Sequence, residues 1–229
     1  MQAQISIVIP TLDAAATLPR VIEALMEGLH AGLIRELIIT DGGSSDATLE
    51  IADAAGAVIV QGPASRGGQL RRGCDLARGT WLMVLHADTR LETGWSTAVA
   101  AHLSEEQGVG YFRLAFRARG LMPVIVAGWA NLRAAVFKLP YGDQGMLISH
   151  HDYQRVGGFP DQPLMEDVAL MRALRRARVP VMSVPCRAVT SAERYRKAGW
   201  VRRGARNLWT LARYFAGTSP ERLVQSYRR

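Results

Sequence analysis

The chain has 229 residues, 48% hydrophobic and 21% charged, a composition that argues against disorder and leaves room for one large domain or one domain with an appendage. Its net charge of +8 is concentrated at one end. Residues 194–229 contain ten Lys and Arg and one acid, Glu221, whereas residues 1–193 contain 18 basic and 19 acidic groups. Because the body is near neutral, we expect no nucleic-acid partner, and we expect a domain at 1–193 followed by a basic tail at 194–229.

The composition also argues against several other classes. Cys74 and Cys186 are far apart and have no partner at ligand spacing, so neither a structural zinc site nor a disulfide framework is predicted, and a reducing cytoplasm is the default. Met1–Pro10 lacks the charged region and the long apolar run of a signal peptide. Leu121–Ala130, the longest apolar stretch, is about half a bilayer span, so no transmembrane helix is predicted.

Strands and helices alternate along the first half of the chain. Strands are expected at Ile5–Ile9 (stopped by Pro10), Leu37–Thr40, Ala57–Val60 and Trp81–His86. Helices are expected from Thr17, the N-cap, to about Gly28, and at Ala47–Ala55, Gly68–Ala77 and Glu92–Leu103. This alternation predicts a parallel sheet with right-handed crossovers. After Gly110–Phe116 the pattern is less regular, with a helix at Pro123–Phe137 and a glycine-rich turn at Tyr141–Gly145.

A first polar cluster, Asp41–Asp46 (DGGSSD), directly follows the second expected strand. Its two glycines let the backbone come close to a ligand, and Asp41 stands at the carboxyl end of the strand, where open α/β sheets bind ligands. A turn leading into a helix capped by Ser45 or Asp46 explains the rest of the cluster but leaves Asp41 unexplained. Asp41 is therefore a candidate binding residue.

A second candidate is Arg66, in the segment Ser65–Gly79 (SRGGQLRRGCDLARG). It precedes two glycines at the start of a helix, where a guanidinium, backbone amides and the helix dipole together can hold a phosphate. The alternative is a solvent-facing arginine on an amphipathic helix. Neither the dinucleotide-binding glycine pattern nor the P-loop pattern occurs, which argues against both of those folds.

A third polar cluster lies at the end of the buried strand in Thr80–Arg90 (TWLMVLHADTR). His86 and Asp88, two positions apart, directly follow its apolar run. Asp88 at this edge would either cap a helix or hold a cation.

A fourth polar cluster lies in Leu164–Arg176 (LMEDVALMRALRR), with Glu166 and Asp167 at a helix N-terminus. Capping is one interpretation of the acidic pair, and a general base that deprotonates a hydroxyl is the other.

The order of these segments carries a resemblance to a known family. ISIVIPTLDAAATL, DGGSSD, RGGQLRRGCDLARGTWLMVLHADT, YGDQGMLI, GGFPD and MED together resemble the family 2 glycosyltransferases of GT-A fold, over about residues 4–180. The chain looks most similar to small stand-alone bacterial members with His-Ala-Asp where many relatives have Asp-x-Asp. Some of those are associated with arsenosugar biosynthesis, and some relatives glycosylate lipids or carotenoids. The resemblance implies an α/β GT-A fold, with a mainly parallel sheet flanked by helices, and a UDP- or GDP-sugar donor.

The resemblance also assigns roles to individual residues. Asp88 matches the acid that coordinates a divalent metal on the nucleotide diphosphate, and Mn²⁺ or Mg²⁺ suits carboxylate and phosphate oxygens. His86 stands where the family has its first acid, near the ribose. This difference leaves open the contact with the ribose and the number of metal ions bound. The alternative role for His86 is packing or hydrogen bonding. Asp41 matches the position that reads the base, with Gly42 where many members have a second Asp. The positions that line the nucleotide pocket in relatives are here Pro10, Thr11 and Arg66.

The reaction that the resemblance implies is a single displacement with inversion. Asp167 matches the catalytic base, with Glu166 beside it, and the base takes the proton of the acceptor hydroxyl as its oxygen attacks the anomeric carbon. Metal and cationic groups stabilise the departing diphosphate. The Gln-x-x-Arg-Trp element of processive relatives is absent, and Glu193–Arg196 (ERYR) is a loose analogue, so a non-processive enzyme is predicted.

Two other functions fit these residues less well. A nucleotidyltransferase would need a glycine-rich, arginine-containing loop after the first strand, and PTLDAAAT contains no glycine. A sugar-nucleotide-binding or membrane-attached protein without turnover would have no need of Asp88 and Asp167. The sequence does not identify the sugar or the acceptor, which is a small molecule or a lipid.

The tail segment Trp200–Phe215 predicts an amphipathic helix. Its apolar stripe comprises Val201, Ala205, Leu208, Leu211 or Ala212, and Phe215, with arginines largely off the stripe and Trp200, Trp209 and Tyr214 as interfacial aromatics. One interpretation is a cytoplasmic protein held peripherally on an anionic membrane surface by residues 194–229. The other is a helix that packs its apolar stripe on the sheet and leaves its arginines in solvent.

Overall fold

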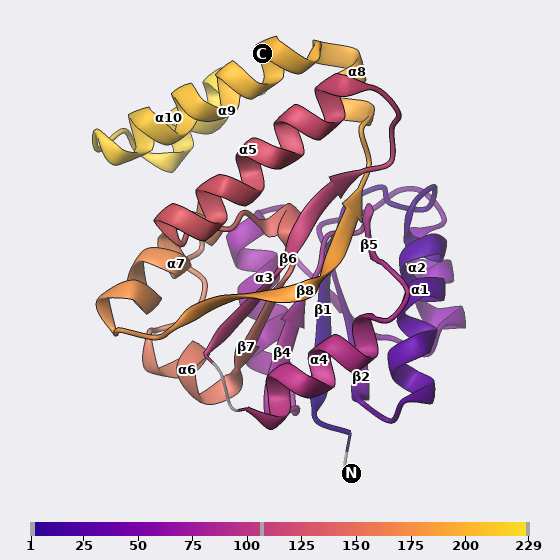
Figure 1. Ribbon diagram of the computed structural model, residues 1–229. Helices are drawn as coiled ribbons and strands as arrows, with labels where there is room; N and C mark the ends of the chain where they lie inside the picture. The colour runs from indigo at the N-terminus through magenta and orange to yellow at the C-terminus, as the bar shows by residue number, and fades with distance from the viewer. Residues whose placement is uncertain (1–2, 106–107, 228–229) are drawn as a thin grey trace.

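The computed structural model describes residues 3–105 and 108–227, and these residues form an α/β structure around one eight-stranded sheet (Figure 1). The strand order is β3-β2-β1-β4-β7-β6-β8-β5. The strands are β1 (Ile5–Thr11), β2 (Ile34–Asp41), β3 (Val58–Gln61), β4 (Trp81–Val84), β5 (Thr89–Leu91), β6 (Val109–Phe116), β7 (Met146–Ser149) and β8 (Val181–Thr190). Helices cover both faces, which confirms the predicted fold class.

The first four strands form a parallel half-sheet with β1 at its centre. β1 pairs with β2 along its whole length, from Ile5 to Thr11, but with β4 only as far as Val8. The expectation that Pro10 stops the first strand is therefore wrong. Beyond Val8 the strand has a ladder partner on one side, so the missing N–H of Pro10 breaks no bond to β4. The carboxyl ends of β1, β2 and β4 meet at one edge of the sheet.

The second half of the sheet mixes directions, which accounts for the less regular pattern after residue 110. β7 runs antiparallel to β4 and β6, whereas β6 and β8 are parallel. β5 was not expected from the sequence. It follows the turn after β4 and pairs antiparallel with β8, from Thr89 opposite Thr190 to Leu91 opposite Ala188. The helix expected from Glu92 therefore begins later, at Trp95, after Gly94 turns the chain with a φ of +91°.

Two hydrophobic cores lie on opposite faces of the sheet. The helices that contribute to one core are α1 (Leu18–His30), α2 (Thr48–Ala54) and α4 (Trp95–Ser104). Those that contribute to the other include α3 (Arg66–Leu76), α6 (His150–Arg155) and α7 (Glu166–Arg176). Strands β1 and β4 are buried throughout or nearly so, as their unbroken apolar runs predict. α1 has Thr17 at its N-cap as expected, although the Thr17 side chain bonds Ala14 O rather than a helix amide.

The end of the chain forms a helical layer beside the sheet. α5 (Leu121–Phe137) packs along β6, and α8 (Glu193–Ala198), α9 (Trp200–Phe215) and α10 (Pro220–Tyr227) follow β8, with α9 next to α5 (Figure 1). The predicted helix at Trp200–Phe215 is confirmed. Arg228 and Arg229 of the predicted basic tail lie outside the described residues. In residues 3–105 and 108–227, no helix is both long and apolar enough to cross a bilayer.

Candidate active site

Two adjoining cavities open at the carboxyl edge of the parallel half-sheet. The wide cavity, of about 620 Å³, is lined by residues after β1, by the start of α3 and by the tail. The narrow cavity, of about 110 Å³, lies between the turn after β4, the start of α7 and the tail. Arg66, His86 and Asp88 line both cavities. The structure therefore brings three of the predicted site residues to the boundary between the two spaces.

His86 and Asp88 occupy the turn after β4, because the buried strand ends at Val84 rather than at His86 as expected. The turn is closed by the Thr89 N–H, which donates to the His86 carbonyl at 3.1 Å. The Asp88 carboxylate is half-buried and accepts a long 3.4 Å hydrogen bond from the Thr89 hydroxyl. Most of its capacity to accept hydrogen bonds or to bind a cation thus faces the cavities.

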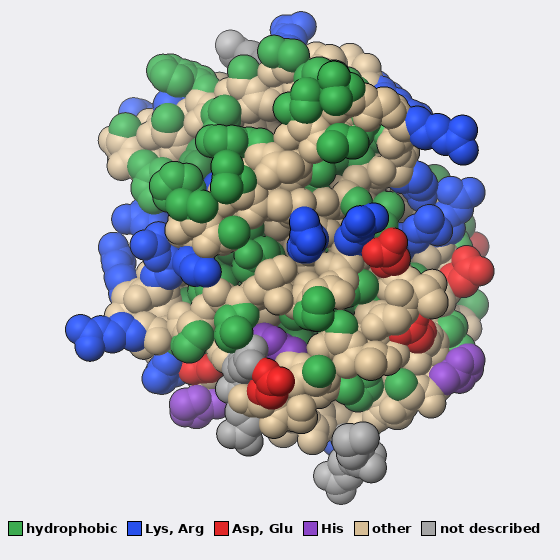
Figure 2. Space-filling view, in the orientation of Figure 1, with side chains coloured by type: hydrophobic (Ala, Val, Ile, Leu, Met, Phe, Trp, Pro, Cys, Tyr) green, Lys and Arg blue, Asp and Glu red, His purple; other side chains and the backbone are tan. Residues whose placement is uncertain are grey.

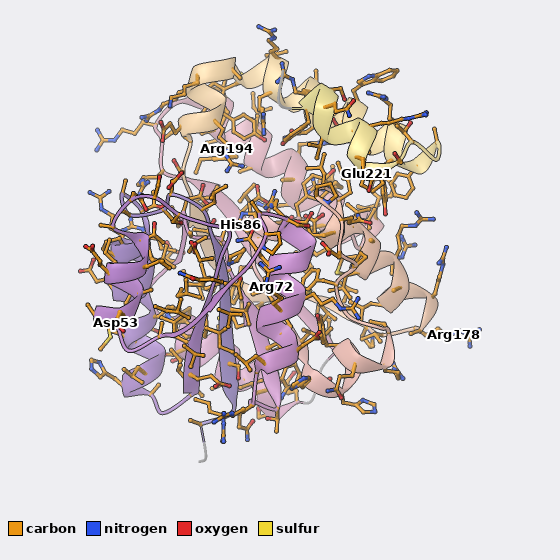
Figure 3. All side chains as sticks on the ribbon, turned by 180° about the vertical axis from the view of Figure 1, so that it is seen from behind. Asp53, Arg72, His86, Arg178, Arg194 and Glu221 are labelled. Atoms are coloured by element: carbon orange, nitrogen blue, oxygen red, sulfur yellow. The ribbon has the colours of Figure 1, made fainter. Side chains whose placement is uncertain are left out.

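Arg66, the first residue of α3, joins His86 to the acidic pair. Its Nη2 lies 2.6 Å from His86 Nε2, and its Nε lies 3.2 Å from Glu166 Oε1. Burial first, and then the positive charges of Arg66 and Arg194, hold the pKa of His86 well below its usual value. His86 is therefore a neutral imidazole that accepts from Arg66 through Nε2. Figure 3 shows His86 at the end of the sheet, with Arg194 of the tail above it.

The Gly67 and Gly68 amides at the start of α3, which the sequence offered to a phosphate, have partners within the protein. The Gly67 N–H donates to the Gln162 carbonyl at 3.0 Å, and the Gly68 N–H faces the Ser65 hydroxyl, the N-cap, at 3.4 Å. A Cβ on Gly67 would lie 2.1 Å from the Pro160 carbonyl oxygen, so the 160–162 loop seals this terminus. The Arg66 side chain still lines both cavities, and its contact with a phosphate stays a prediction.

Glu166 and Asp167 begin α7, as the sequence predicts, but their environments differ. Glu166 is 2% exposed, and burial raises the pKa of its carboxyl while the guanidinium of Arg66 opposes that shift. Asp167 accepts from the Gly142 N–H through Oδ2 at 2.8 Å and from the Val168 N–H through Oδ1 at 2.7 Å. Glu166 is thus engaged in an ion pair, whereas Asp167 is held by backbone donors at the wall of the narrow cavity.

Asp143 is a site residue that the sequence analysis missed, because Tyr141–Gly145 was interpreted only as a turn. It lines the narrow cavity, and its Oδ1 is buried with no hydrogen-bond partner among the described residues. Burial raises its pKa to about 6; Arg133 opposes the shift, while Asp167 and Asp88 add to it. A signal was available in the sequence, since Asp143 is the first acid after Glu106.

The tail supplies further residues that sequence reasoning did not place at the site. The tail residues that line the narrow cavity are Arg194, Tyr195, Arg203, Asn207 and Tyr227, and Arg206 lines the wide cavity. They are joined to one another: the Arg203 guanidinium donates to the Tyr227 hydroxyl, which donates to Asn207 Oδ1 at 3.1 Å. The amide of Asn207 donates to the Tyr195 hydroxyl at 3.1 Å. The helices α8–α10 therefore form a wall of the site.

The residues at the ends of β1 and β2 separate into two groups. Pro10 and Thr11 line the wide cavity, and their contact with a nucleotide stays a prediction. Asp41 lines neither cavity and is fully buried. Its Oδ1 accepts from the hydroxyls of Thr11 and Ser44, and its Oδ2 accepts from the N–H groups of Gly43 and Ser44, both at 2.8 Å. Burial would raise the pKa of Asp41, but these four hydrogen bonds outweigh it and lower the pKa. In this structure Asp41 anchors the glycine-rich turn, and its contact with a base stays a prediction.

The arrangement of polar groups at the carboxyl edge of a parallel half-sheet agrees with a comparison of the sequence with known families. The model of the family described as glycosyl transferase family 2 matches residues 6–120. The chain belongs to this family. The match includes Pro10, Thr11, Arg66, His86 and Asp88, and it ends before the acidic pair.

Relatives and solved structures extend the comparison. The "PGL/p-HBAD biosynthesis glycosyltransferase" of Mycobacterium bovis (strain BCG / Pasteur 1173P2) is 37% identical over 110 residues, covering 44% of this chain and 42% of that protein. The chain thus matches less than half the length of this curated relative. Glucosyl-3-phosphoglycerate synthase from Mycobacterium tuberculosis, solved with Mn²⁺, UDP and phosphoglyceric acid, is 22% identical with a TM-score of 0.61, covering 90% of this chain and 77% of that one. S. aureus TarS 1-349 in complex with UDP is 16% identical with a TM-score of 0.62, covering 83% and 61%. At these identities the structural matches establish the GT-A glycosyltransferase fold.

Proposed function

We propose that this protein is a glycosyltransferase that moves a sugar from a nucleotide diphosphate to an acceptor hydroxyl by a single displacement with inversion. The observation that carries the proposal is the convergence of Asp88 and Asp167 on the narrow cavity, from the turn after β4 and from the start of α7. One carboxylate has acceptor capacity free for a cation. The other is fixed by backbone donors at a place where a hydroxyl can reach it.

The wide cavity is the proposed donor site, with Pro10 and Thr11 on its nucleotide side and Arg66 toward the diphosphate. A UDP- or GDP-sugar is the proposed donor, and the UDP bound by both structural neighbours favours the first. A single displacement inverts the anomeric carbon because the acceptor attacks opposite the leaving diphosphate. Negative charge develops on that diphosphate, and Arg66, Arg194 and Arg203 line the cavities where it would lie.

The site fits a divalent cation, Mn²⁺ or Mg²⁺, although no group of three or more His, Cys, Asp or Glu side chains that could hold a metal is found in the described residues. Mg²⁺ commonly uses one or two carboxylates together with substrate phosphates and water. Asp88 supplies one carboxylate, and the unpartnered Oδ1 of Asp143 is a second oxygen at the same cavity. When bound, the cation neutralises charge on the diphosphate.

Asp167 is the proposed general base. The hydrogen bond from the Gly142 N–H fixes its carboxylate, so that one lone pair can accept the proton of the acceptor hydroxyl. Glu166, paired with Arg66, is proposed to position that arginine rather than to take the proton. His86, as a neutral acceptor, holds the other end of the same guanidinium. We retain His86 as a group near the ribose and Asp41 as a reader of the base.

The remaining assignments concern subclass and context. We place the chain with the His-Ala-Asp members, some of which are associated with arsenosugar biosynthesis, because His86 and Asp88 stand in that pattern. We propose a non-processive enzyme of two parts, a GT-A domain at 1–193 and a basic helical tail at 194–229. The acceptor is a small molecule or a lipid, and the tail supplies positive charge for peripheral attachment to an anionic membrane.

A donor screen tests this function. Thermal unfolding would be followed with UDP- and GDP-sugars, with and without Mn²⁺, and a donor that raises the Tm only with the metal is expected. Transfer from that donor to a panel of hydroxyl acceptors would then be measured, and NMR would give the anomeric configuration of the product. Failure of every donor to raise the Tm would contradict nucleotide-sugar binding, and retained configuration would contradict the single displacement.

A further inference from the structure

Helix α5 presents an apolar face to solvent rather than to the core. Its exposed side chains recur at helical spacing and comprise Leu121, Val124, Ile125, Trp129, Leu132 and Val136. The exposed fractions of Leu121 and Val124 reach 72% and 68%. The side of α5 that faces inward carries alanines and the buried Arg133, which donates to the Leu139 carbonyl and to Gln144. α5 thus has the polarity opposite to that of a surface helix of a globular protein.

Helix α9 also presents apolar side chains to solvent. The apolar stripe that the sequence placed along this helix is largely exposed, with Val201 at 72% and Phe215 at 49%, and Trp209 beside it is 66% exposed. Arg203 and Arg206 point instead toward the cavities, where Arg203 bonds Tyr227. The alternative in which the stripe packs on the sheet and the arginines face solvent is therefore wrong. Of the stripe, Leu211 packs against the core, whereas Val201, Leu208 and Phe215 stay exposed.

The two apolar stripes belong to neighbouring helices. α5 and α9 contact each other, and hydrophobic side chains gather over this layer in Figure 2, with Lys and Arg around them. We call the exposed apolar side chains of α5 and α9 the α5–α9 face. Isolated exposed apolar residues are common on proteins, but a contiguous set over two helices marks an interaction surface.

The charge around the α5–α9 face indicates its partner. Exposed Arg119 and Lys138 flank α5 at its two ends, and exposed Arg202 lies on α9. Residues 107–142 and 194–220 contain no acid at all. A second copy of the chain docked on this face would bring these like charges together without a counter-charge, whereas an anionic lipid surface supplies one.

We propose that the α5–α9 face docks on an anionic lipid bilayer, with α5 lying in the plane of the membrane and its apolar side chains in the boundary between headgroups and acyl chains. Helices with an apolar stripe, flanking basic residues and exposed Trp bind membranes in this way. This inference goes beyond attachment by tail charge, because its main apolar element, α5, lies within the catalytic body. It does not depend on the donor or on the reaction.

Vesicle sedimentation tests the proposal on the full-length chain. The probes are vesicles of phosphatidylcholine with 25% phosphatidylglycerol and vesicles of phosphatidylcholine alone. The face variant carries Ile125→Gln and Leu132→Gln, and the matched control carries Leu29→Gln and Leu76→Gln on α1 and α3. All four side chains are half or nearly half exposed. We expect wild type and control to pellet with the anionic vesicles, and the face variant to bind at least tenfold more weakly.

A second measurement reports on α5 directly and does not rely on the face variant. Cys74 and Cys186 are buried, so a cysteine introduced as Val124→Cys can be labelled selectively with an environment-sensitive fluorophore. Its emission is expected to rise on anionic vesicles, while a label at Leu76→Cys on α3 stays unchanged. Equal binding of face and control variants, an unchanged label at position 124, or a dimer in solution that the face variant dissolves would overturn the proposal.

Discussion

Asp167→Asn separates proton abstraction from every other property of the site. Asparagine matches aspartate in size, and its amide oxygen can still accept from the Gly142 N–H, 2.8 Å away in the wild type. The variant loses the group that takes the proton and, with it, the oxygen that accepts from the Val168 N–H. A positioned general base contributes about 10²–10⁴ in rate, which corresponds to about 2.7–5.5 kcal/mol of barrier. We therefore expect kcat to fall by that factor, with donor affinity close to that of the wild type and a Tm lowered slightly by the lost hydrogen bond from Val168.

Glu166→Gln is the matched comparison for this experiment. Its carboxylate lies 3.2 Å from Arg66 Nε and is 3% exposed, whereas the Arg66 side chain is 36% exposed. Removing one partner of a fully buried pair costs about 3–5 kcal/mol, and solvent access to Arg66 reduces this to about 1–3 kcal/mol. We expect a lower Tm, weaker donor binding and a milder loss of kcat than in Asp167→Asn.

Single-turnover transfer, calorimetric titration of the donor and thermal unfolding would be measured for both variants and the wild type. A larger loss of kcat in Glu166→Gln than in Asp167→Asn, with both variants folded and saturated with donor, would show that the base is assigned to the wrong carboxylate. An unchanged kcat in Asp167→Asn, with the variant folded and saturated with donor, would show that Asp167 does not act in the chemical step.

Asp88→Asn should abolish metal-dependent binding of UDP in calorimetry; a variant that loses about 1 kcal/mol of stability, as for a helix cap, yet still binds UDP with Mn²⁺ would contradict the metal role. Gly142→Ala would place a Cβ 2.5 Å from His86 Nε2, the atom that contacts Arg66, so we expect a lower kcat/KM for the donor. Unchanged kinetics would show that the contact between His86 and Arg66 is dispensable. The pKa of Asp143 is raised to about 6 from 3.8, so its proton stabilises the folded state at low pH and this stabilisation is lost as pH rises through 6. In urea unfolding between pH 4 and 7, the free energy of unfolding of the wild type should therefore fall relative to that of Asp143→Asn, and parallel curves would refute the shift.

The sequence predicted those parts of the structure that depend on local pattern. Unbroken apolar runs identified β1 and β4, and the 3.6-residue period identified α9 with its correct bounds. Polar residues directly after such strands were expected at one edge of the sheet. Asp88 lies there, and Asp167 reaches the same cavity from the start of α7.

What the sequence did not predict depends on contacts between distant segments. β5 has three residues, and its place is set by pairing with β8, about a hundred positions later in the chain. The contact of Arg66 with Glu166 is equally distant. Hydrophobic periodicity located the stripe on α9 but could not give its direction, since a stripe facing a core and one facing a membrane have the same period. The sequence also did not show that Asp41 anchors its own turn, because that role depends on where the Thr11 and Ser44 hydroxyls lie in the fold.

The strand order has a consequence for the way the chain folds during synthesis. β1 to β4 are neighbours in sequence and in space, so this half of the sheet can form as soon as Val84 has been made. β5 follows immediately, yet its partner β8 is completed only at Thr190. Contacts between distant segments form late and slow the folding of a domain. A nascent or truncated chain that ends before β8 would therefore leave β5 without its partner and expose the edge of β6, and such unpaired edges are sites of aggregation.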